Sequence, residues 1–361
     1  MGSPYPPRRP VRPGSSSGSR RGRRRVAGRL SQPLPRSRVQ RAMLRFRRAL
    51  GQLFVWHGWP TVVSVATAVA AIAALFFTAQ SLNANSNQYH LAQRGQVSER
   101  FAKAVEQLGS AQLEVRLGGI YSLEQLAVDS PQDHGTVFEV LAAFVRSHAP
   151  SDDPRCVPDP NNENRGVPSN SVDLQATLAV VGRRDTGHDR DRIDLTETCL
   201  IGANLYRANL TDANLYRAIL SGAILGGANL SGTNLYGADL PDAFLVGADL
   251  VGAYLAGANL SGAGLGAANL SGADLYDANL TDANLPGTDL TGTDLTGATL
   301  TDADLTDATL TGATLTDADL TDTDLHGTNL SGANLTGALL RDIRYNHSTQ
   351  WPAGFTPPPS R

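Results

Sequence analysis

The sequence predicts a mainly β solenoid, preceded by a small α-helical domain and one transmembrane helix. Three observations lead to this prediction. A five-residue repeat fills the C-terminal part of the chain, an uncharged apolar stretch follows a basic N-terminus, and helical spacing of apolar residues marks the segment between them. The chain has 361 residues, of which 41% are hydrophobic, so it can hold more than one domain.

Leucine recurs at every fifth position from Leu195 to Leu340, and two residues before it stands alanine or threonine, except at Ile193. A period of five fits neither a helix nor a strand. The Gly, Asn, Asp and Thr between the leucines disfavour helix interiors and suit turns. We therefore predict a solenoid in which each repeat forms one short side and one corner, with leucine and the small residue pointing inward. Leucines predicted to be structural include Leu195, Leu205, Leu230, Leu260, Leu290, Leu320 and Leu340.

This pattern resembles the pentapeptide-repeat family, whose A(D/N)LXX motif is seen in residues 203–207 (ANLYR) and 273–277 (ADLYD). The resemblance implies a right-handed quadrilateral β-helix over residues 191–342, with four repeats per coil. At ~4.8 Å per coil, thirty repeats would give about seven and a half coils and a rod roughly 35 Å long. A disordered low-complexity tract is the alternative, but disorder does not require an invariant leucine.

Residues 1–48 are predicted to be a disordered tail rich in Arg and Pro. The first 50 residues carry fifteen arginines and no acidic residue, and the first acidic residue of the chain is Glu99. The tail can act as a membrane-topology signal, or it can bind anionic lipid head groups or nucleic acid. It lacks the interleaved aromatics that base recognition uses, which favours lipid over nucleic acid.

A transmembrane helix is predicted in residues 53–81, inside a window that has no formal charge from Ala49 to Gln93. Trp56 and Trp59 stand at one end, where an aromatic belt lies at a membrane interface. A cleaved signal peptide is disfavoured by the long basic region, and a buried core helix is the other alternative. The arginines before the span predict a single-pass plasma-membrane protein with a cytoplasmic N-terminus and an outside repeat domain.

Between the span and the repeats, residues 88–148 are predicted to form an α-helical domain, in which residues 130–133 (SPQD) cap and start a helix. This segment weakly resembles one that precedes the repeats in some bacterial membrane-anchored pentapeptide-repeat proteins, and its expected role is to cover the first coil. A linker follows at 149–170 and a capping helix at 171–184. Residues 343–361 are predicted to be a C-terminal cap and a Pro-rich tail that leaves the fold.

No catalytic constellation and no cofactor motif is found, so we predict that the protein is not an enzyme. If coils have twenty residues, carboxylates twenty apart stack in a column. We interpret this column in one of three ways: as a solvated acidic face, as a surface facing a basic partner, or as a loose site for Ca²⁺ or another hard cation. The column comprises Asp282, Asp302, Asp322 and Asp342, with Asp304 and Asp324 two residues along.

A second column contains Tyr216, Tyr236 and Tyr276, and Glu197 would stack next to Arg217 and could pair with it. The two cysteines are Cys156 in the linker and Cys199 in an outward position of the first coil. Outside the cell they could form a disulfide, and two free thiols are the alternative.

The function favoured by these observations is a non-enzymatic, membrane-anchored scaffold for protein–protein interaction, whose partner the sequence does not identify. The family resemblance also implies an alternative, an acidic DNA mimic that binds DNA gyrase, because residues 191–342 carry twenty acidic residues and four arginines. The relatives that bind gyrase usually have phenylalanine at some central positions and dimerise through a C-terminal helix. Here all thirty central positions are leucine and the C-terminus is rich in proline, which argues against this alternative. A cation-binding surface module is the third possibility.

Overall fold

The computed structural model describes residues 42–43, 45–48, 59–157 and 171–361. The chain divides into two compact units, Met1–Asn85 and Ser86–Arg361, which are considered separately. The predicted tail lies almost wholly outside the described residues, as do Trp56 and most of the predicted linker. Residues 42–43 and 45–48 are helical, and the described part further contains the helices α2 to α5, a short 3₁₀ helix (Thr186–His188) and the coils of the solenoid, without an extended strand.

Helix α2 (Trp59–Leu108) contains the predicted apolar segment. Residues Thr61–Ala84 are long and apolar enough to cross a membrane, and none of that stretch is buried by protein. Two hydroxyls within it are satisfied locally, because Thr67 and Thr78 donate to the carbonyls of Val63 and Ala74 at 2.7 Å. One long apolar helix is thus confirmed, and α2 runs without a break into the segment predicted as a separate helical domain.

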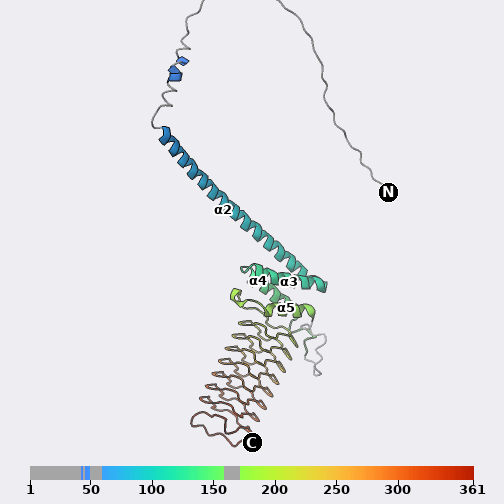
Figure 1. The fold of residues 1–361 in the computed structure, drawn as a ribbon. Coiled ribbons are helices and arrows are strands. Elements are labelled where there is room, and N and C mark those ends of the chain that lie inside the picture. Colours follow the sequence, from blue (N-terminus) through green and yellow to red (C-terminus); the bar gives the residue numbers. More distant parts are fainter. Residues whose placement is uncertain (1–41, 44, 49–58, 158–170) are drawn as a thin grey trace, which may run out of the picture. The chain divides into compact units, whose positions relative to one another are not determined.

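The last turns of α2 pack with α3 (Leu113–Asp129), α4 (His134–His148) and α5 (Val172–Gly182) (Figure 1). Gly119 permits the close approach of α3, because a Cβ there would lie 2.8 Å from the Ala104 carbonyl oxygen and the Leu108 nitrogen. Each of the three shorter helices buries apolar side chains at three- and four-residue spacing. These are Ile120, Leu123 and Leu126 on α3, Val137, Leu141 and Val145 on α4, and Leu174, Leu178 and Val181 on α5.

The predicted helix start at residues 130–133 is wrong, because α4 begins at His134. The Ser130 hydroxyl donates to the Asp133 carboxylate at 2.6 Å, and the Asp133 N–H donates to the Ser130 carbonyl at 2.9 Å. These two bonds close a turn before the helix, so the serine is unavailable as a cap.

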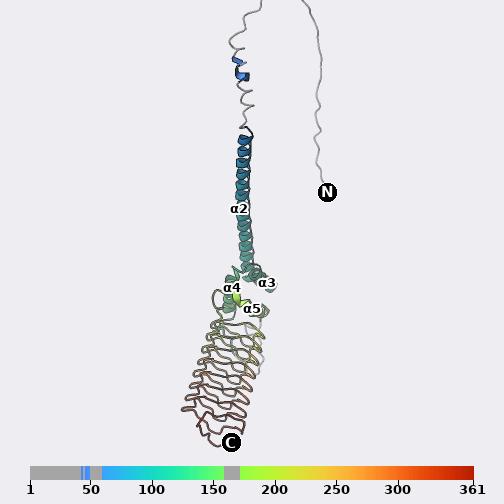
Figure 2. The same cartoon turned by 60° about the vertical axis from the view of Figure 1, so that its left-hand side comes forward.

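The repeats form stacked coils of twenty residues, four repeats to a coil (Figures 1 and 2). The residue before the leucine makes a parallel bridge to the residue twenty positions on, from Asp194–Asn214 to Asp324–Arg344. The bridges stay isolated because a two-residue turn follows each leucine before a second pairing can form. The prediction of a mainly β structure is therefore correct in its parallel pairing and wrong in implying extended strands.

The solenoid core contains little besides leucine and alanine. Six of the seven leucines predicted to be structural are at most 2% exposed, and the seventh, Leu340 at the C-terminal end, is partly buried. Threonine replaces the inward alanine in a few repeats, as at Thr233 and Thr288. Their hydroxyls donate to the carbonyls of Leu210 and Leu265, so the substitution leaves no unsatisfied polar group.

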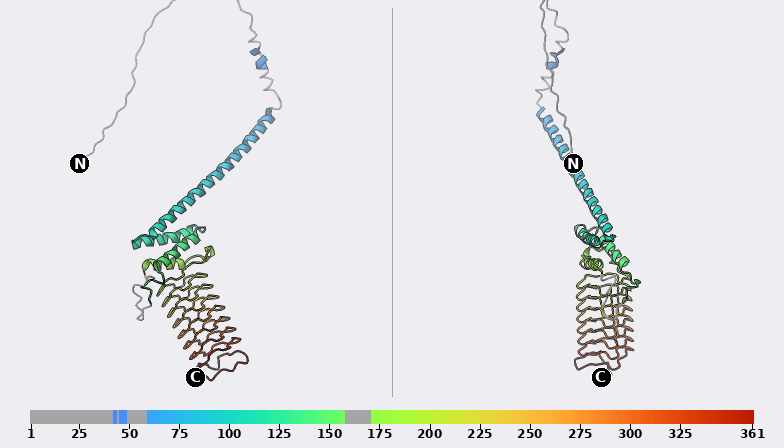
Figure 3. Two further views of the ribbon diagram at one scale, coloured as in Figure 1. Left: turned by 180° about the vertical axis from the view of Figure 1, so that it is seen from behind. Right: turned by 90° about the vertical axis from the view of Figure 1, so that its right-hand side faces the viewer.

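Protein covers the N-terminal end of the solenoid (Figure 3). Pro150 pairs antiparallel with Thr198, and the Cys199 N–H donates to the Ala149 carbonyl at 2.7 Å. At the end of α5, the Gly182 carbonyl accepts from the Asn209 N–H at 2.8 Å. Backbone groups that an open edge would expose are thereby paired.

At the C-terminal end, Trp351 packs between Tyr345 and Phe355, with ring centroids 5.3 and 5.4 Å apart. The expectation that the Pro-rich tail leaves the fold is wrong. Tyr345 donates its hydroxyl to the Pro358 carbonyl at 2.9 Å, and the Arg361 N–H donates to the Ile343 carbonyl at 3.0 Å. A proline lacks the backbone N–H but keeps its carbonyl group, and the Pro358 carbonyl helps to hold the tail against the last coil.

Candidate functional site

Each repeat presents three outward positions whose directions the backbone fixes. The Asn or Asp before the leucine accepts from the N–H two residues on, as Asn204 Oδ1 does from Tyr206 at 3.1 Å. The second residue after the leucine has a positive φ, which glycine adopts most easily. Asp277 (φ 53°) shows that Asp also occupies this corner position. The exterior is thus a regular array that tolerates different side chains.

The predicted aspartate column occupies one of these corners, where Asp282, Asp302, Asp322 and Asp342 have φ between 54° and 60°. At other corners glycine follows a corner aspartate one coil on, as Gly327 follows Asp307. The Asp307 carboxylate occupies the space that this glycine leaves open, since a Cβ at Gly327 would lie 2.0 Å from it. Among the described coils, only this corner stacks Asp on Asp. Its residues therefore combine an unfavourable left-handed backbone with repulsion between like charges.

Cationic side chains of this chain face the C-terminal end of the column. Arg361 Nη1 lies 2.6 Å from Asp322 Oδ1. Asp324 faces His326 Nδ1 at 2.5 Å and Arg344 Nε at 3.4 Å. Burial raises the pKa of Asp324, but the His326 hydrogen bond and the Arg344 charge outweigh burial and the pKa is lowered.

The predicted column does not come together as a metal site. Across residues 59–157 and 171–361, no three His, Cys, Asp or Glu side chains are placed to hold a metal ion. The corner carboxylates follow one another along the rod, one per coil, instead of converging on a common point. This arrangement suits an extended basic surface better than a compact cation.

The predicted tyrosine column is present. The rings of Tyr216 and Tyr236 stack with centroids 5.9 Å apart and planes at 16°. Within the described solenoid no ion pair joins Glu197 to Arg217, so that expected contact is wrong. The Arg217 guanidinium carbon lies 5.2 Å from the centroid of the Tyr216 ring instead, a cation–π arrangement. Arg207 and Tyr206 repeat it at 5.3 Å.

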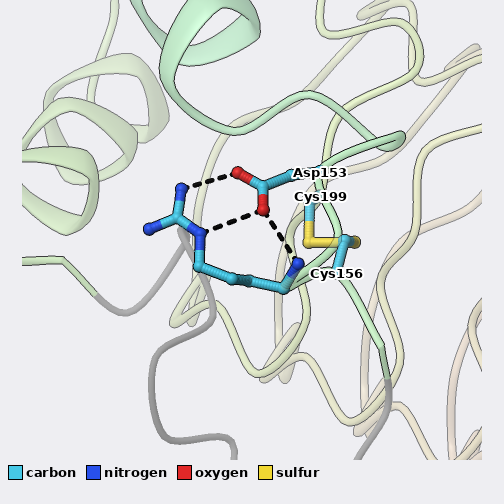
Figure 4. The surroundings of a disulfide bond; sticks show 4 residues. Asp153, Cys156 and Cys199 are labelled. Atoms are coloured by element: carbon cyan, nitrogen blue, oxygen red, sulfur yellow. Dashed lines mark hydrogen bonds and ion pairs between the residues drawn. A yellow bond between two sulfur atoms is a disulfide. The ribbon is translucent and has the colours of Figure 1, made fainter.

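A disulfide joins Cys156 to Cys199, with Cα atoms 5.8 Å apart, and this resolves the alternatives that the sequence left open (Figure 4). It fastens the loop after α4 to the first coil. Beside it, Arg155 hydrogen-bonds the Asp153 carboxylate and lowers the pKa of Asp153 to about 2. Cys199 is buried although its repeat position faces outward, because this loop covers it.

A buried ionic cluster lies where α5 meets the first coil, and no motif in the sequence predicts it. The Arg184 side chain is 1% exposed, contacts Asp189 at 2.8 Å and donates to the carbonyls of Asn209 and Thr211. His134 Nδ1 lies 3.4 Å from Asp189 Oδ1 without a hydrogen bond between them. Burial lowers the pKa of His134, although Asp189 opposes this shift. An Arg and an Asp five residues apart in a loop carry no distinguishing pattern.

A family model described as pentapeptide repeats (8 copies) matches residues 191–227, 228–265, 265–302 and 303–342. The chain belongs to the pentapeptide-repeat family, whose members are generally non-enzymatic structural or interaction modules. Comparison with curated proteins finds no match.

Solved structures of other pentapeptide-repeat proteins also match part of the chain. HetL, a protein involved in regulation of heterocyst differentiation from the cyanobacterium Nostoc sp. strain PCC 7120, is 35% identical over 42% of this chain and 79% of HetL, with a TM-score of 0.29. The protein alr5209 from Nostoc PCC 7120 is 39% identical over 30% of this chain and 77% of its own, with a TM-score of 0.14. QnrB1, a plasmid-mediated fluoroquinolone resistance protein, is 20% identical over 43% and 78%, with a TM-score of 0.36.

Proposed function

We propose that this protein is a non-enzymatic scaffold, anchored in the membrane by the apolar part of α2, whose solenoid binds other proteins. One observation carries the proposal. In the repeats, the leucine and the small residue two positions before it pack in the core, and the other three side chains form four regular exposed faces. A rigid, repeated exterior on a core of fixed composition is how solenoid proteins present extended binding surfaces.

The anchor is supported by Thr61–Ala84, where large apolar side chains are exposed, such as that of Phe77 at 74%. Lipid is the environment that would cover them. Fifteen arginines precede this segment, which favours a cytoplasmic N-terminus.

The disulfide supports placing the repeats outside the cell. Cys156 and Cys199 are 43 residues apart in sequence, yet the fold brings their Cα atoms to 5.8 Å. Such bonds form and persist in oxidising compartments and are rare in the cytoplasm. The basic tail and the disulfide are independent of each other, and both favour the same orientation.

Crosslinking in intact membranes tests the scaffold. Four variants of the full chain would each change the outward residues of one face to serine and keep every leucine. We expect a protein crosslinked to the wild-type chain to be lost in one or two variants and kept in the others, with circular dichroism unchanged. A crosslinked protein that survives all four substitutions would contradict binding through the faces.

An acidic mimic of DNA that binds gyrase is a second candidate, favoured by the twenty acidic residues against four arginines in residues 191–342. The proposed anchor and orientation would keep the solenoid away from a cytoplasmic enzyme. Addition of the detergent-solubilised chain to a gyrase supercoiling assay tests it. Inhibition at stoichiometric concentration would support the mimic, and unchanged supercoiling at a large excess would dispose of it.

A further inference from the structure

The exposed apolar side chains of the solenoid are not evenly distributed over its four faces. We define the Tyr206 face by the leucines 205, 225, 245 and every twentieth residue on, and the Tyr236 face by the leucines 215, 235, 255 and on. Two repeats separate these faces in each four-repeat coil, so they lie on opposite sides of the rod. The nine large apolar residues of the coils that are exposed divide into four on the Tyr206 face, three on the Tyr236 face and two elsewhere, Val251 and Leu339.

The Tyr206 face carries Tyr206, Ile224, Phe244 and Val246, of which Phe244 is 56% and Val246 is 57% exposed. Glycine and proline continue it at Gly264 and Pro286 without a charge. The face carries no carboxylate over five successive coils, or ~24 Å at ~4.8 Å per coil, and Arg207 at its edge is its one charged side chain there. Its carboxylates begin only at the next coil, with Asp304.

The Tyr236 face carries aromatic rings over four successive coils at the same height of the rod. Tyr236, Tyr254 and Tyr276 are between 48% and 52% exposed, and Tyr216 stacks on Tyr236. Large apolar side chains therefore line two strips at the same height on opposite sides, of which the strip on the Tyr236 face also contains Asp274. Contiguous exposed apolar surface of this kind marks a contact site in a soluble domain.

We propose that the occupant of each strip is a second copy of this chain, with the Tyr206 face of one copy against the Tyr236 face of the next. A two-fold dimer would cover one strip in each copy and leave the other in water. A front-to-back contact covers both and repeats indefinitely, because its two halves are different surfaces. The copies would form a side-by-side row. This inference rests on the proposed contact role of the faces and names their partner.

Charge and anchoring select a parallel arrangement. Arg207 stands at the edge where the Tyr206 face meets the Leu210 face, and the exposed Asp212 stands where the Leu210 face meets the Tyr236 face, so parallel copies bring opposite charges together along that edge. Antiparallel copies would set Asp304 and Asp307 of one chain against the tyrosines of the other. The strip is short for a stable soluble interface of ~800 Å² per partner. Copies held in one membrane gain the high effective concentration that a short contact requires.

Paired cysteines in the full chain, crosslinked in membranes with a short bis-maleimide, test the row. Gly264→Cys places a thiol on the Tyr206 face, where its Cβ meets nothing closer than 4.0 Å, and Asp274→Cys places one on the Tyr236 face. We expect a ladder of dimers, trimers and higher species from the double variant. The control pair, Asn259→Cys with Asn269→Cys on the other two faces at the same ten-residue separation, should give none.

The single variant Gly264→Cys separates a row from a two-fold dimer. A row predicts no crosslink from it, and a strong dimer band would overturn the proposal. Adding Tyr236→Ser and Phe244→Ser to the crosslinking pair should shorten the ladder at least several-fold, since both residues are exposed and outside the core. Absence of any ladder from the original pair would overturn the row while leaving contacts with other proteins intact, which the face-by-face serine variants measure separately.

Discussion

The junction at residues 149–199 and the coils that follow it are stabilised in opposite ways. The junction relies on single contacts that occur once: the Cys156–Cys199 disulfide, the buried Arg184–Asp189 pair and the Pro150–Thr198 bridge. The coils rely on one contact set repeated every five residues. The stability of the junction should therefore be more sensitive to single substitutions than that of the coils, because a repeated contact has neighbours that compensate and a single contact does not.

The largest effect is expected from Arg184→Ala at the junction. It would leave Asp189 buried without its main partner and two coil carbonyls without a donor, at a cost of about 3–5 kcal/mol. Native-state hydrogen exchange should show loss of protection in α5 and the first coil. Arg155→Ala, which breaks an exposed pair, is the matched control and should cost less than ~1 kcal/mol.

Within the coils, Leu260→Ala should cost about 2–5 kcal/mol, because the fully packed side chain leaves a cavity in a core of leucines. The loss of exchange protection should be confined to the neighbouring coils, since each coil contacts only the next. Leu340→Ala at the partly buried end is the control and should cost less. Loss of protection in α3 or α4 would contradict the nearest-neighbour account.

Removal of the disulfide by Cys156→Ser with Cys199→Ser should destabilise the junction by about 2–4 kcal/mol. Thermal unfolding of the wild-type chain with and without reductant should reproduce the difference, and the double variant should not respond to reductant. A wild-type melting temperature that reductant leaves unchanged would show that the bond is absent or without effect.

At the aspartate column, Asp302→Gly should stabilise the coils, by up to about 1 kcal/mol. It removes a non-glycine residue at φ 60° and one of four stacked carboxylates. The melting temperature should rise most at low ionic strength, where repulsion is least screened. Asp307→Gly, whose next coil already has glycine at Gly327, should gain less.

The smallest effect concerns pH. Burial lowers the pKa of His134 below its ordinary 6.5, so the neutral ring contributes stability that is present above pH 6.5 and lost as the pH falls through the lowered value. Asp189, His188, Asp185 and Arg184 face the same site. The melting temperature should fall between pH 7.5 and 5.5, above the range of carboxylate titration. His134→Phe should flatten that part of the profile.

The sequence was informative for the coils because their contacts are local and repeated. A leucine at every fifth residue from Leu195 to Leu340 defines the inward direction, and the Tyr216–Tyr236 stack follows from a coil of twenty. The isolated character of the bridges was not foreseen, because it depends on how the turn after each leucine is placed.

The junction and the C-terminal end were less accessible from sequence. Arg184 meets the carbonyl of Thr211, and Tyr345 meets that of Pro358, through contacts that no periodicity encodes. The sequence is compatible with either a disulfide or two free thiols, and only the distance between the two cysteines in the fold distinguishes these alternatives. Grouping the exposed residues into two opposite strips likewise required the coil to be known.

Thiol labelling of intact cells determines whether the anchored solenoid presents its faces outside the cell. Val251→Cys places a thiol on a face that neither apolar strip occupies, and the native cysteines are already joined. We predict that a membrane-impermeant maleimide labels this variant without permeabilisation and labels Ser15→Cys in the N-terminal tail only after it. Labelling of Val251→Cys that requires permeabilisation would contradict the account.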